Sequence, residues 1–301
     1  MLFQPDYLKA GDTIAIISTA RKISIEEIQP AIDLFESWGL KVRLGKTIGA
    51  SENQFAGTDA MRAADFQAML DDDDIKAIVM GRGGYGTVRM MDNINYHRFV
   101  AYPKWIVGYS DITFLHNYIN QFFGIQTLHA SMPINFSTNT PEAIESLRKA
   151  LFGEVQTIRF EGEHIHFDKD IQGEIAGGNL SILYAMLGTT NGFNLNDKIL
   201  VIEDLDEYLY HIDRMMMAMK KAGKLQGLKA LLVGGMSDMK DNAIPFGKTA
   251  EEIIIEHCSP YGYPIIFNAP IGHITNNHAI KLGSEITLRK SLDSNSIEMV
   301  V

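Results

Sequence analysis

The chain has 301 residues, of which 46% are hydrophobic and 21% charged, as in ordinary globular proteins. Its formal net charge of −10 disfavours nucleic acid as a partner, because binding a polyanion needs a basic surface. No apolar run approaches the ~20 residues that span a bilayer, and no basic segment followed by an apolar one marks a secretory signal at the N-terminus. The single cysteine, Cys258, excludes an internal disulfide and a cysteine-based zinc site. We therefore expect a cytoplasmic protein that binds neither membranes nor nucleic acids.

Strand-like and helix-like segments alternate through the first half of the chain. Apolar residues at helical spacing predict helices over residues 25–38, 60–70 and 111–122. Apolar runs between them predict strands over residues 13–18, 40–44, 75–80 and 104–107. This alternation predicts an α/β fold with a Rossmann-like parallel sheet that carries helices on both faces, and a site at the carboxyl ends of its strands.

The second half begins after a polar connection. Residues 161–170 are charged and hydrophilic, so we expect an N-terminal domain over 1–155, a linker over 156–171 and a C-terminal domain over 172–301. Beyond the linker the pattern predicts helices ending near residue 187 and over about 208–222, and strands over 198–202, 230–233, 264–267 and 286–288. The C-terminal domain is therefore expected to be mixed α/β.

The stretch around Ser110 is the most informative part of the sequence. An apolar run ends at Gly108, Ser110 follows, and a helix-like segment opens behind it. Such a strand-to-helix turn can expose a nucleophilic hydroxyl, with helix N-terminal N–H groups beside a developing oxyanion. The G-x-S-x-G pattern is incomplete, because Ile112 stands in place of its second glycine. A helix cap made by Ser110 or Asp111 is the more common use of such a pattern, so both interpretations stay open.

A glycine loop, residues 81–86, follows the predicted strand 75–80. Gly81, Gly83 and Gly86 fit the spacing of a dinucleotide-binding loop, but that loop follows the first strand of its fold and this one follows the third. No Gly-Lys-Ser/Thr comes next, which excludes a P-loop. Backbone N–H groups of such a loop serve an oxyanion as readily as a phosphate. A plain tight turn is about as common as both uses together.

An acid and a histidine also follow predicted strands. Glu203 ends the strand 198–202, where a carboxylate can orient a histidine, but an acidic loop that caps the next helix explains it equally well. His273 lies in a loop, where a lone histidine is more often structural. Spacing does not separate these residues from their competitors, which are Asp204, Asp206 and Glu207 for the acid and His116, His129 and His278 for the histidine.

Ser110, Glu203 and His273 stand in the chain order of the α/β-hydrolases. Together they offer a nucleophile, an orienting acid and a base. A metal site is a poorer interpretation, because no His-x-x-x-His or Glu-x-x-His cluster joins them. We therefore expect no metal.

Five segments, in order along most of the chain, form a pattern that is typical of one family. They are Arg82–Gly86, Gly108–Asp111, Gly177–Ser181 with Leu187–Thr189, Ile202–Asp204 with Glu207 and Asp213–Arg214, and Gly272–His273 with Asn276. In these segments the chain resembles the LD-carboxypeptidase family, the serine peptidases of murein tetrapeptide and microcin-immunity type. Each segment alone is weak, and all five in order are quite specific.

The resemblance implies a catalytic triad of Ser110, Glu203 and His273, and so it chooses among the acids where spacing does not. It also implies an oxyanion hole made by the N–H groups of Asp111 and Gly84. In such proteins an N-terminal α/β domain carries the serine, a C-terminal domain carries the acid and the histidine, and the active site lies between them. Members are often dimers without a cofactor, so we expect a homodimer.

The activity that the resemblance implies is that of an LD-carboxypeptidase in peptidoglycan recycling. Ser110 would attack the amide between the L-centre of a diamino acid and a C-terminal D-Ala of a murein tetrapeptide, through an acyl-enzyme. Arg82 is a candidate for binding the terminal carboxylate, which needs a cation. Two alternatives stay open: a hydrolase of aminoacyl-nucleotide antibiotics with the same triad, and a non-catalytic binder of muropeptides or nucleotides.

Overall fold

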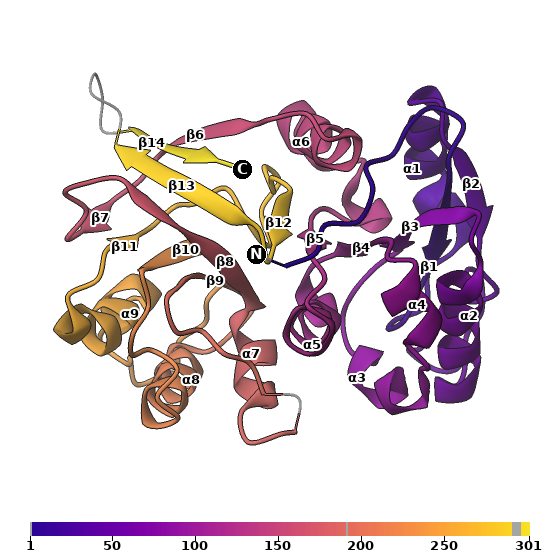
Figure 1. Cartoon of the computed structure of the whole chain (residues 1–301). Coiled ribbons are helices and arrows are strands. Elements are labelled where there is room, and N and C mark those ends of the chain that lie inside the picture. Colours follow the sequence, from indigo (N-terminus) through magenta and orange to yellow (C-terminus); the bar gives the residue numbers. More distant parts are fainter. Residues whose placement is uncertain (1, 191, 291–295) are drawn as a thin grey trace. The chain divides into compact units, whose positions relative to one another are not determined.

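The computed structural model describes residues 2–190, 192–290 and 296–301 of the chain (Figure 1). The described residues group into two compact units. The N-terminal unit holds residues 2–155 and 275–281, and the C-terminal unit holds the described residues of 156–274 and 282–301. The domain boundaries expected from the sequence stay a prediction.

The N-terminal unit is built on a six-stranded sheet in the order β12-β5-β4-β3-β1-β2. Its strands are β1 (Thr13–Ile17), β2 (Lys41–Leu44), β3 (Ile75–Met80), β4 (Trp105–Gly108), β5 (Thr127–His129) and β12 (Ile280–Leu282). The five strands β1 to β5 pair in parallel. The predicted parallel sheet is confirmed.

Helices cover both faces of this sheet, which explains the long apolar runs in its strands. Helices α1 (Ile25–Ser37) and α6 (Pro141–Phe152) share one core cluster with alternate strand residues such as Ile16 and Val79. Helices α2 (Asp59–Asp71) and α5 (Thr113–Phe123) contact the sheet on its other face (Figure 1). Short helices follow the strands: α3 (Thr87–Met90), η1 (Met91–Asn93), α4 (His97–Ala101), η2 (Ser110–Ile112) and η3 (Pro133–Asn135).

The C-terminal unit is built on an eight-stranded mixed sheet in the order β6-β14-β13-β8-β9-β10-β11-β7. Strands β8 to β11 pair in parallel, and the pairs beyond them are antiparallel. The strands are β6 (Thr157–Glu161), β7 (His164–Ile165), β8 (Ile171–Asn179), β9 (Lys198–Leu205), β10 (Ala230–Ser237), β11 (Ile265–Ile266), β13 (Glu285–Lys290) and β14 (Ser296–Val300). The helices are α7 (Leu180–Met186), α8 (Leu209–Lys221), α9 (Ala250–Cys258) and η4 (Ser259–Tyr261). The predicted mixed α/β fold is confirmed.

Strand β8 is absent from the sequence-based prediction because its glycines are typical of loops. A Cβ at Gly177 would lie 2.1 Å from the carbonyl oxygen of Val201, so only glycine lets β8 approach β9 this closely. The segment 156–171, expected to be a linker, holds β6 and β7 of the second sheet. Polar residues in short edge strands hide such strands from a pattern-based prediction.

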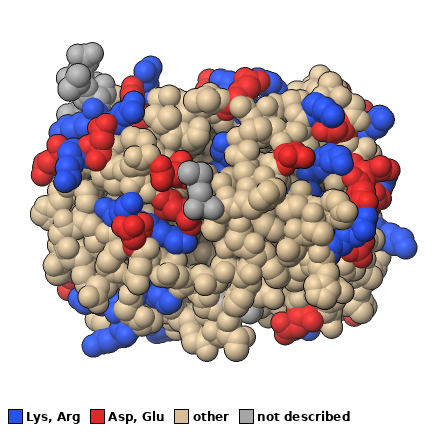
Figure 2. All heavy atoms as spheres, viewed as in Figure 1, with Lys and Arg blue, Asp and Glu red and all other residues tan. Residues whose placement is uncertain are grey.

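Acidic and basic side chains are interspersed on the face drawn in Figure 2. Many charged side chains of the described residues form ion pairs, as Asp59 does with Arg62 and Arg89. On this face the net negative charge is therefore not gathered into one patch. Within the described ranges, no helix is both long and apolar enough to cross a bilayer.

Candidate active site

Ser110 is the first residue of η2, in the turn that follows β4. Its φ is +64°, a left-handed conformation that costs a non-glycine residue about 1–2 kcal/mol. A Cβ at Gly108 would lie 2.9 Å from Cγ1 of Ile112, so this turn is closely packed. Ser110 is not a helix cap, because the N-cap of η2 is Tyr109 and that of α5 is Ile112. A strained serine at the carboxyl end of a parallel strand fits a nucleophile better than a cap.

The side chain of Asp111 caps a different helix. Its Oδ2 accepts a 2.9 Å hydrogen bond from the backbone N–H of Thr87, the first residue of α3. The N-cap of α3 is Gly86, which has no side chain to do this. Burial raises the pKa of Asp111, and the hydrogen bond from Thr87 opposes that rise. Asp111 therefore does not cap the helix that follows it, as one interpretation of the sequence had it, and its backbone N–H stays a predicted oxyanion donor.

The glycine loop contacts Ser110 within the N-terminal unit. A Cβ at Gly83 would lie 3.1 Å from Cβ and 3.2 Å from Oγ of Ser110. Gly84 has a φ of +114°, and a Cβ there would meet the side chain of Arg21 at 2.6 Å. Glycine is required at Gly84 by its conformation, and a side chain at Gly83 would crowd the serine. The structure therefore brings the predicted loop and the predicted nucleophile together.

Two histidines of the N-terminal unit, His116 and His129, are fully buried next to this turn. Burial lowers the pKa of His116 to about 3, so its ring is neutral. Its Nε2 lies 2.8 Å from the carbonyl oxygen of Gly108 and donates to it. His129 is also fully buried, with its ring centre 5.8 Å from that of Tyr109. Both rings thus support the end of β4.

The guanidinium of Arg82 contacts the backbone of the segment that follows β1. Its Nη1 donates a 3.3 Å hydrogen bond to the carbonyl oxygen of Lys22. Among the described residues, no carboxylate forms an ion pair with it. Its assignment to the carboxylate of a substrate remains a prediction.

Glu203 and His273 form a hydrogen-bonded pair within the C-terminal unit. Nδ1 of His273 lies 2.6 Å from Oε2 of Glu203, and the backbone N–H of His273 donates to the same oxygen at 3.2 Å. Glu203 is completely buried in β9, whereas the side chain of His273 is 14% exposed. An acid that holds Nδ1 of a partly accessible histidine is the arrangement of a catalytic acid and base.

The charge state of His273 reflects two opposing effects. Burial alone would lower its pKa, but the negative charge of Glu203 and the hydrogen bond to it raise the pKa by more. The net result is a pKa above the usual 6.5. A carboxylate partner thus stabilises the imidazolium that forms when the ring accepts a proton.

Asp204 has a separate structural task. Its Oδ1 accepts from Nδ2 of Asn179 at 3.0 Å, and its Oδ2 accepts from the backbone N–H of Ser181 at 2.8 Å. It therefore holds the first turn of α7. Burial and the charge of Glu203 raise the pKa of Asp204 to about 7. Successive side chains of a strand point to opposite faces, so the neighbouring acids serve different partners.

The other competing acids bind elsewhere. Asp206 forms an ion pair with Lys240, and Glu207 pairs with Nδ1 of His211 one helical turn on. Among the described residues, Glu203 is the acid paired with His273.

Gly272 and Gly234 pack against Glu203. A Cβ at Gly272 would lie 2.6 Å from Cβ, Cγ and Oε2 of Glu203, and one at Gly234 would lie 3.2 Å from its Cβ. Gly234 was not identified from the sequence. A glycine pair ending an apolar run is the signal that could have identified it.

Replacing Gly272 with alanine should therefore destabilise the C-terminal unit. Gly262→Ala is the matched control, because Gly262 also has a positive φ, of +76°, but has nothing within 4 Å of a Cβ. We expect the free energy of unfolding to fall by about 1–3 kcal/mol more for Gly272→Ala than for the control, from overpacking. Urea unfolding measures the difference. Equal losses would mean that backbone conformation alone requires glycine at 272.

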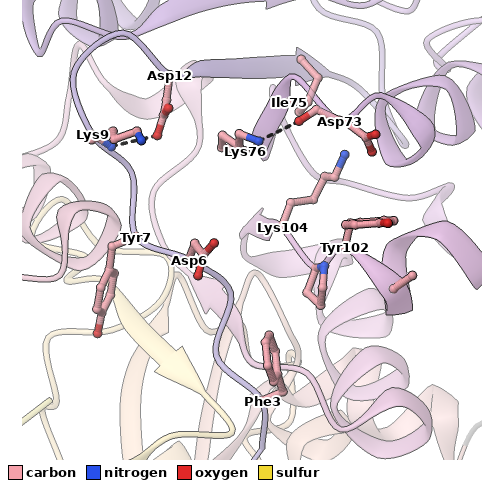
Figure 3. Close-up of a pocket in the computed structure, with 12 residues that line it drawn as sticks. Phe3, Asp6, Tyr7, Lys9, Asp12, Asp73, Ile75, Lys76, Tyr102 and Lys104 are labelled. Atoms are coloured by element: carbon pink, nitrogen blue, oxygen red, sulfur yellow. Dashed lines mark hydrogen bonds between the residues drawn. The ribbon is translucent and has the colours of Figure 1, made fainter.

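A cavity of about 810 Å³ lies at the amino ends of the strands of the N-terminal sheet (Figure 3). Its lining includes Asp12, Ile75 and Lys104, which stand at the amino ends of β1, β3 and β4. Nζ of Lys104 donates to the backbone carbonyls of Met69 and Asp72. Ser110 and the glycine loop follow the carboxyl ends of the strands, so this cavity is not where the serine lies.

Two family models match the chain. The LD-carboxypeptidase N-terminal domain matches residues 14–130, and the LD-carboxypeptidase C-terminal domain matches residues 172–288. A relative from Bacillus subtilis (strain 168), named probable murein peptide carboxypeptidase, is 31% identical over 98% of this chain and 94% of its own length. The murein tetrapeptide carboxypeptidase of Pseudomonas aeruginosa is 25% identical over 91% of this chain and 92% of its own.

Solved structures share the fold. The muramoyltetrapeptide carboxypeptidase of Oxalobacter formigenes matches with a TM-score of 0.84 at 23% identity, covering 95% of this chain and 98% of its own. The microcin C7 self immunity protein in complex with aspartyl sulfamoyl adenosine matches with a TM-score of 0.87 at 21% identity, over 100% and 98% of the chains. The family models that match both halves, and the 31% identity to the Bacillus subtilis relative, show that the chain belongs to the LD-carboxypeptidase family of serine-type carboxypeptidases.

Proposed function

We propose that this protein is an LD-carboxypeptidase of murein tetrapeptides whose catalytic triad is Ser110, Glu203 and His273. The observation that carries the proposal is the 2.6 Å hydrogen bond between His273 and buried Glu203. The strained turn that presents Ser110 supports it from the N-terminal unit. The proposal requires Ser110 of one unit to act with His273 of the other. The names of relatives that act on murein peptides support the substrate class.

The proposed reaction follows from the tautomer of His273. Because Nδ1–H donates to Glu203, Nε2 is left to accept the hydroxyl proton of Ser110. Oγ of Ser110 then attacks the carbonyl carbon, and the oxyanion accepts hydrogen bonds from the backbone N–H groups of Asp111 and Gly84. Each such donor lowers the barrier by about 3 kcal/mol.

The second half of the reaction uses the same base. The imidazolium of His273 gives its proton to the leaving nitrogen, and D-Ala departs from the acyl-enzyme. Water then loses a proton to Nε2 and attacks the ester, which releases the shortened peptide and restores Ser110. No redox step or cofactor enters this scheme.

The substrate in this proposal has an amide between the L-centre of a diamino acid and a C-terminal D-Ala. Arg82 is proposed to bind the terminal carboxylate, and the absence of an ion pair to it among the described residues supports that role. We further propose that the protein acts in the cytoplasm, in peptidoglycan recycling, as a homodimer without a cofactor.

The direct test is release of D-Ala. The purified protein is incubated with a murein tetrapeptide ending in D-Ala, and free alanine is measured by mass spectrometry, with the same peptide ending in L-Ala as the matched control. We expect release from the first peptide only. Equal release from both peptides would contradict the LD specificity, and no release from a folded protein would reject the substrate.

The alternative of an aminoacyl-nucleotide hydrolase with the same triad is an outcome of the same experiment. Aspartyl sulfamoyl adenosine is the probe, because a solved structure of like fold holds it. Cleavage of this compound in place of the tetrapeptide would favour the alternative. Binding of either compound without turnover would favour a non-catalytic binder.

A further inference from the structure

The side chain of Asp111 joins two segments that are far apart in the sequence. Asp111 follows the proposed nucleophile, and its Oδ2 accepts a 2.9 Å hydrogen bond from the backbone N–H of Thr87. The residue is 1% exposed. Across the described part of the chain, its other oxygen, Oδ1, accepts no hydrogen bond. The bond to Thr87 is therefore the hydrogen bond through which this carboxyl group acts on the backbone.

Thr87 is where the glycine loop ends. The loop runs from β3 to α3, and Thr87 is the first residue of α3. Oγ1 of Thr87 lies 2.8 Å from Oγ1 of Thr19, in the segment that follows β1. Nη2 of the buried Arg62 donates a 3.5 Å hydrogen bond to the carbonyl oxygen of Gly86. Asp111 is thus part of a buried set of groups that hold this end of the loop.

The middle of the loop contacts the serine. A side chain at Gly83 would meet Cβ and Oγ of Ser110 at 3.1 and 3.2 Å. The next residue, Gly84, is one of the two proposed oxyanion donors, and Asp111 is the other. One residue therefore carries a proposed donor on its backbone and, through its carboxyl group, fixes the end of the loop that carries the second donor.

We infer that Asp111 is a positioning residue, whose carboxyl group fastens the glycine loop to the nucleophile turn so that the N–H groups of Asp111 and Gly84 keep the separation that an oxyanion requires. The inference rests on the proposed function. Two donors act together only when both point at the same oxygen, and this requires them to be held before the substrate arrives. A loop of glycines has little stiffness of its own, so an external bond must hold it.

The side chain needs to accept a hydrogen bond, and it does not need a charge. Asparagine has the same shape and retains a carbonyl oxygen that can accept from Thr87 N–H. Burial disfavours the ionised carboxylate, whereas the hydrogen bonds from Thr87 and the charge of Arg62 favour it. Alanine removes the bond and leaves the first N–H of α3 without this acceptor. Asp111→Asn and Asp111→Ala therefore separate positioning from charge.

The matched control is Asp65→Ala. Asp65 is likewise a buried aspartate of the N-terminal unit, and it accepts from the backbone N–H groups of Lys46 and Thr47 at 2.9 Å. It holds a different turn from the glycine loop. Removing the Asp65 carboxylate should destabilise the N-terminal unit at least as much as Asp111→Ala does. The activity of Asp65→Ala therefore shows how much a loss of stability alone lowers activity.

Each variant of the full chain is measured in two ways: kcat and KM for D-Ala release, and the rate at which a fluorophosphonate labels Ser110. We expect Asp111→Ala to lower kcat about 10²-fold, as loss of an oxyanion donor does, with KM within about 3-fold of the native value. Labelling should slow in proportion. The kcat of Asp111→Asn should stay within about 5-fold of the native value, and that of Asp65→Ala within about 3-fold of it.

The inference is overturned if Asp111→Ala keeps kcat near the native value, if Asp111→Asn loses as much as Asp111→Ala, or if Asp65→Ala loses as much as either. Labelling separates this failure from that of the proposed function. A native protein that is labelled at Ser110 but releases no D-Ala rejects the substrate, and the labelling rates of the variants then decide the inference. A native protein that is neither labelled nor active rejects Ser110 as the nucleophile, and the inference with it.

Discussion

Replacing Ser110 with alanine is expected to lower kcat for D-Ala release by about 10⁴–10⁶-fold, because the attacking oxygen is removed while the rest of the site remains. KM should change little, since the proposed contacts to substrate do not involve this hydroxyl. The fold should persist, because alanine occupies less volume and has the same difficulty as serine at a φ of +64°. Steady-state kinetics and thermal unfolding of the purified variant measure these effects.

Ser37→Ala is the control for this substitution. Ser37 lies at the exposed end of α1, where its hydroxyl donates to the carbonyl of Leu34. We expect native kcat from this variant. Substantial turnover by folded Ser110→Ala would contradict the proposed nucleophile, whereas loss of activity together with unfolding would show that Ser110 is needed for the fold.

The Ser110→Gly variant distinguishes the backbone strain at residue 110 from the catalytic role of the serine hydroxyl. Glycine adopts positive φ without steric cost, so this variant should be as inactive as Ser110→Ala but more stable than native protein by about 1 kcal/mol. Such a gain would show that the turn holds its serine at the expense of stability, as active sites commonly do. Lower stability than native would mean that the Ser110 side chain itself stabilises the turn. Urea unfolding measures the change.

The turn at Ser110 could be predicted because its signals are local. The apolar strand, Gly108 and the following helix lie within one short stretch, and the structure has β4, η2 and α5 there. The choice of Glu203 over Asp204 was different, because neighbouring acids at the end of a strand look alike in a sequence. Only the resemblance to a family distinguished Glu203 from Asp204. In the structure the two acids have different partners: Glu203 binds His273, and Asp204 binds the first turn of α7.

Features that depend on distant partners were not predicted. Strand β6 pairs with β14 at the other end of the C-terminal unit's sequence, and although apolar residues alternate in both, each strand has only five residues. Residues 275–281, after His273, return to the N-terminal unit, where Asn276 accepts a hydrogen bond from Thr140. The bond from Thr87 to Asp111 spans 24 residues. Pairings of this kind come from the tertiary fold, which sequence patterns do not encode locally.

Replacing Glu203 with glutamine should lower the plateau value of kcat by about 10²–10⁴-fold, because an amide can hold His273 in the wrong tautomer and no longer stabilises its imidazolium. The pH profile should change as well. Activity needs neutral His273, so native activity rises as pH increases through the raised pKa of that residue. Without the carboxylate, burial remains and lowers the pKa. The acidic limb of the profile should therefore move to lower pH.

Asp213→Asn is the matched control, since Asp213 accepts from Nε2 of His257 at 2.9 Å in another acid–histidine pair of the C-terminal unit. We expect the acidic limb of its profile to stay at the native position. A limb that stays in place in Glu203→Gln, or that moves equally in both variants, would mean that His273 is not the titrating base. Rates across about pH 5.5–9 cover the change.

The same pair makes a prediction for stability whose sign is fixed by linkage. His273 has a higher pKa in the folded protein than the value of about 6.5 in the unfolded chain, so folding favours its protonated form. This contribution is complete below about pH 6.5 and is lost as pH rises through the folded pKa. The difference in unfolding free energy between native protein and Glu203→Gln should therefore be larger near about pH 6 than near about pH 8.5. Urea unfolding at the two values tests this, and a difference that grows with pH would contradict a carboxylate that stabilises protonated His273. During catalysis His273 is protonated only transiently, when it has accepted the proton of Ser110. The carboxylate of Glu203, which stabilises protonated His273 in the folded protein at low pH, is therefore also expected to stabilise this transient imidazolium and to lower the barrier at neutral pH.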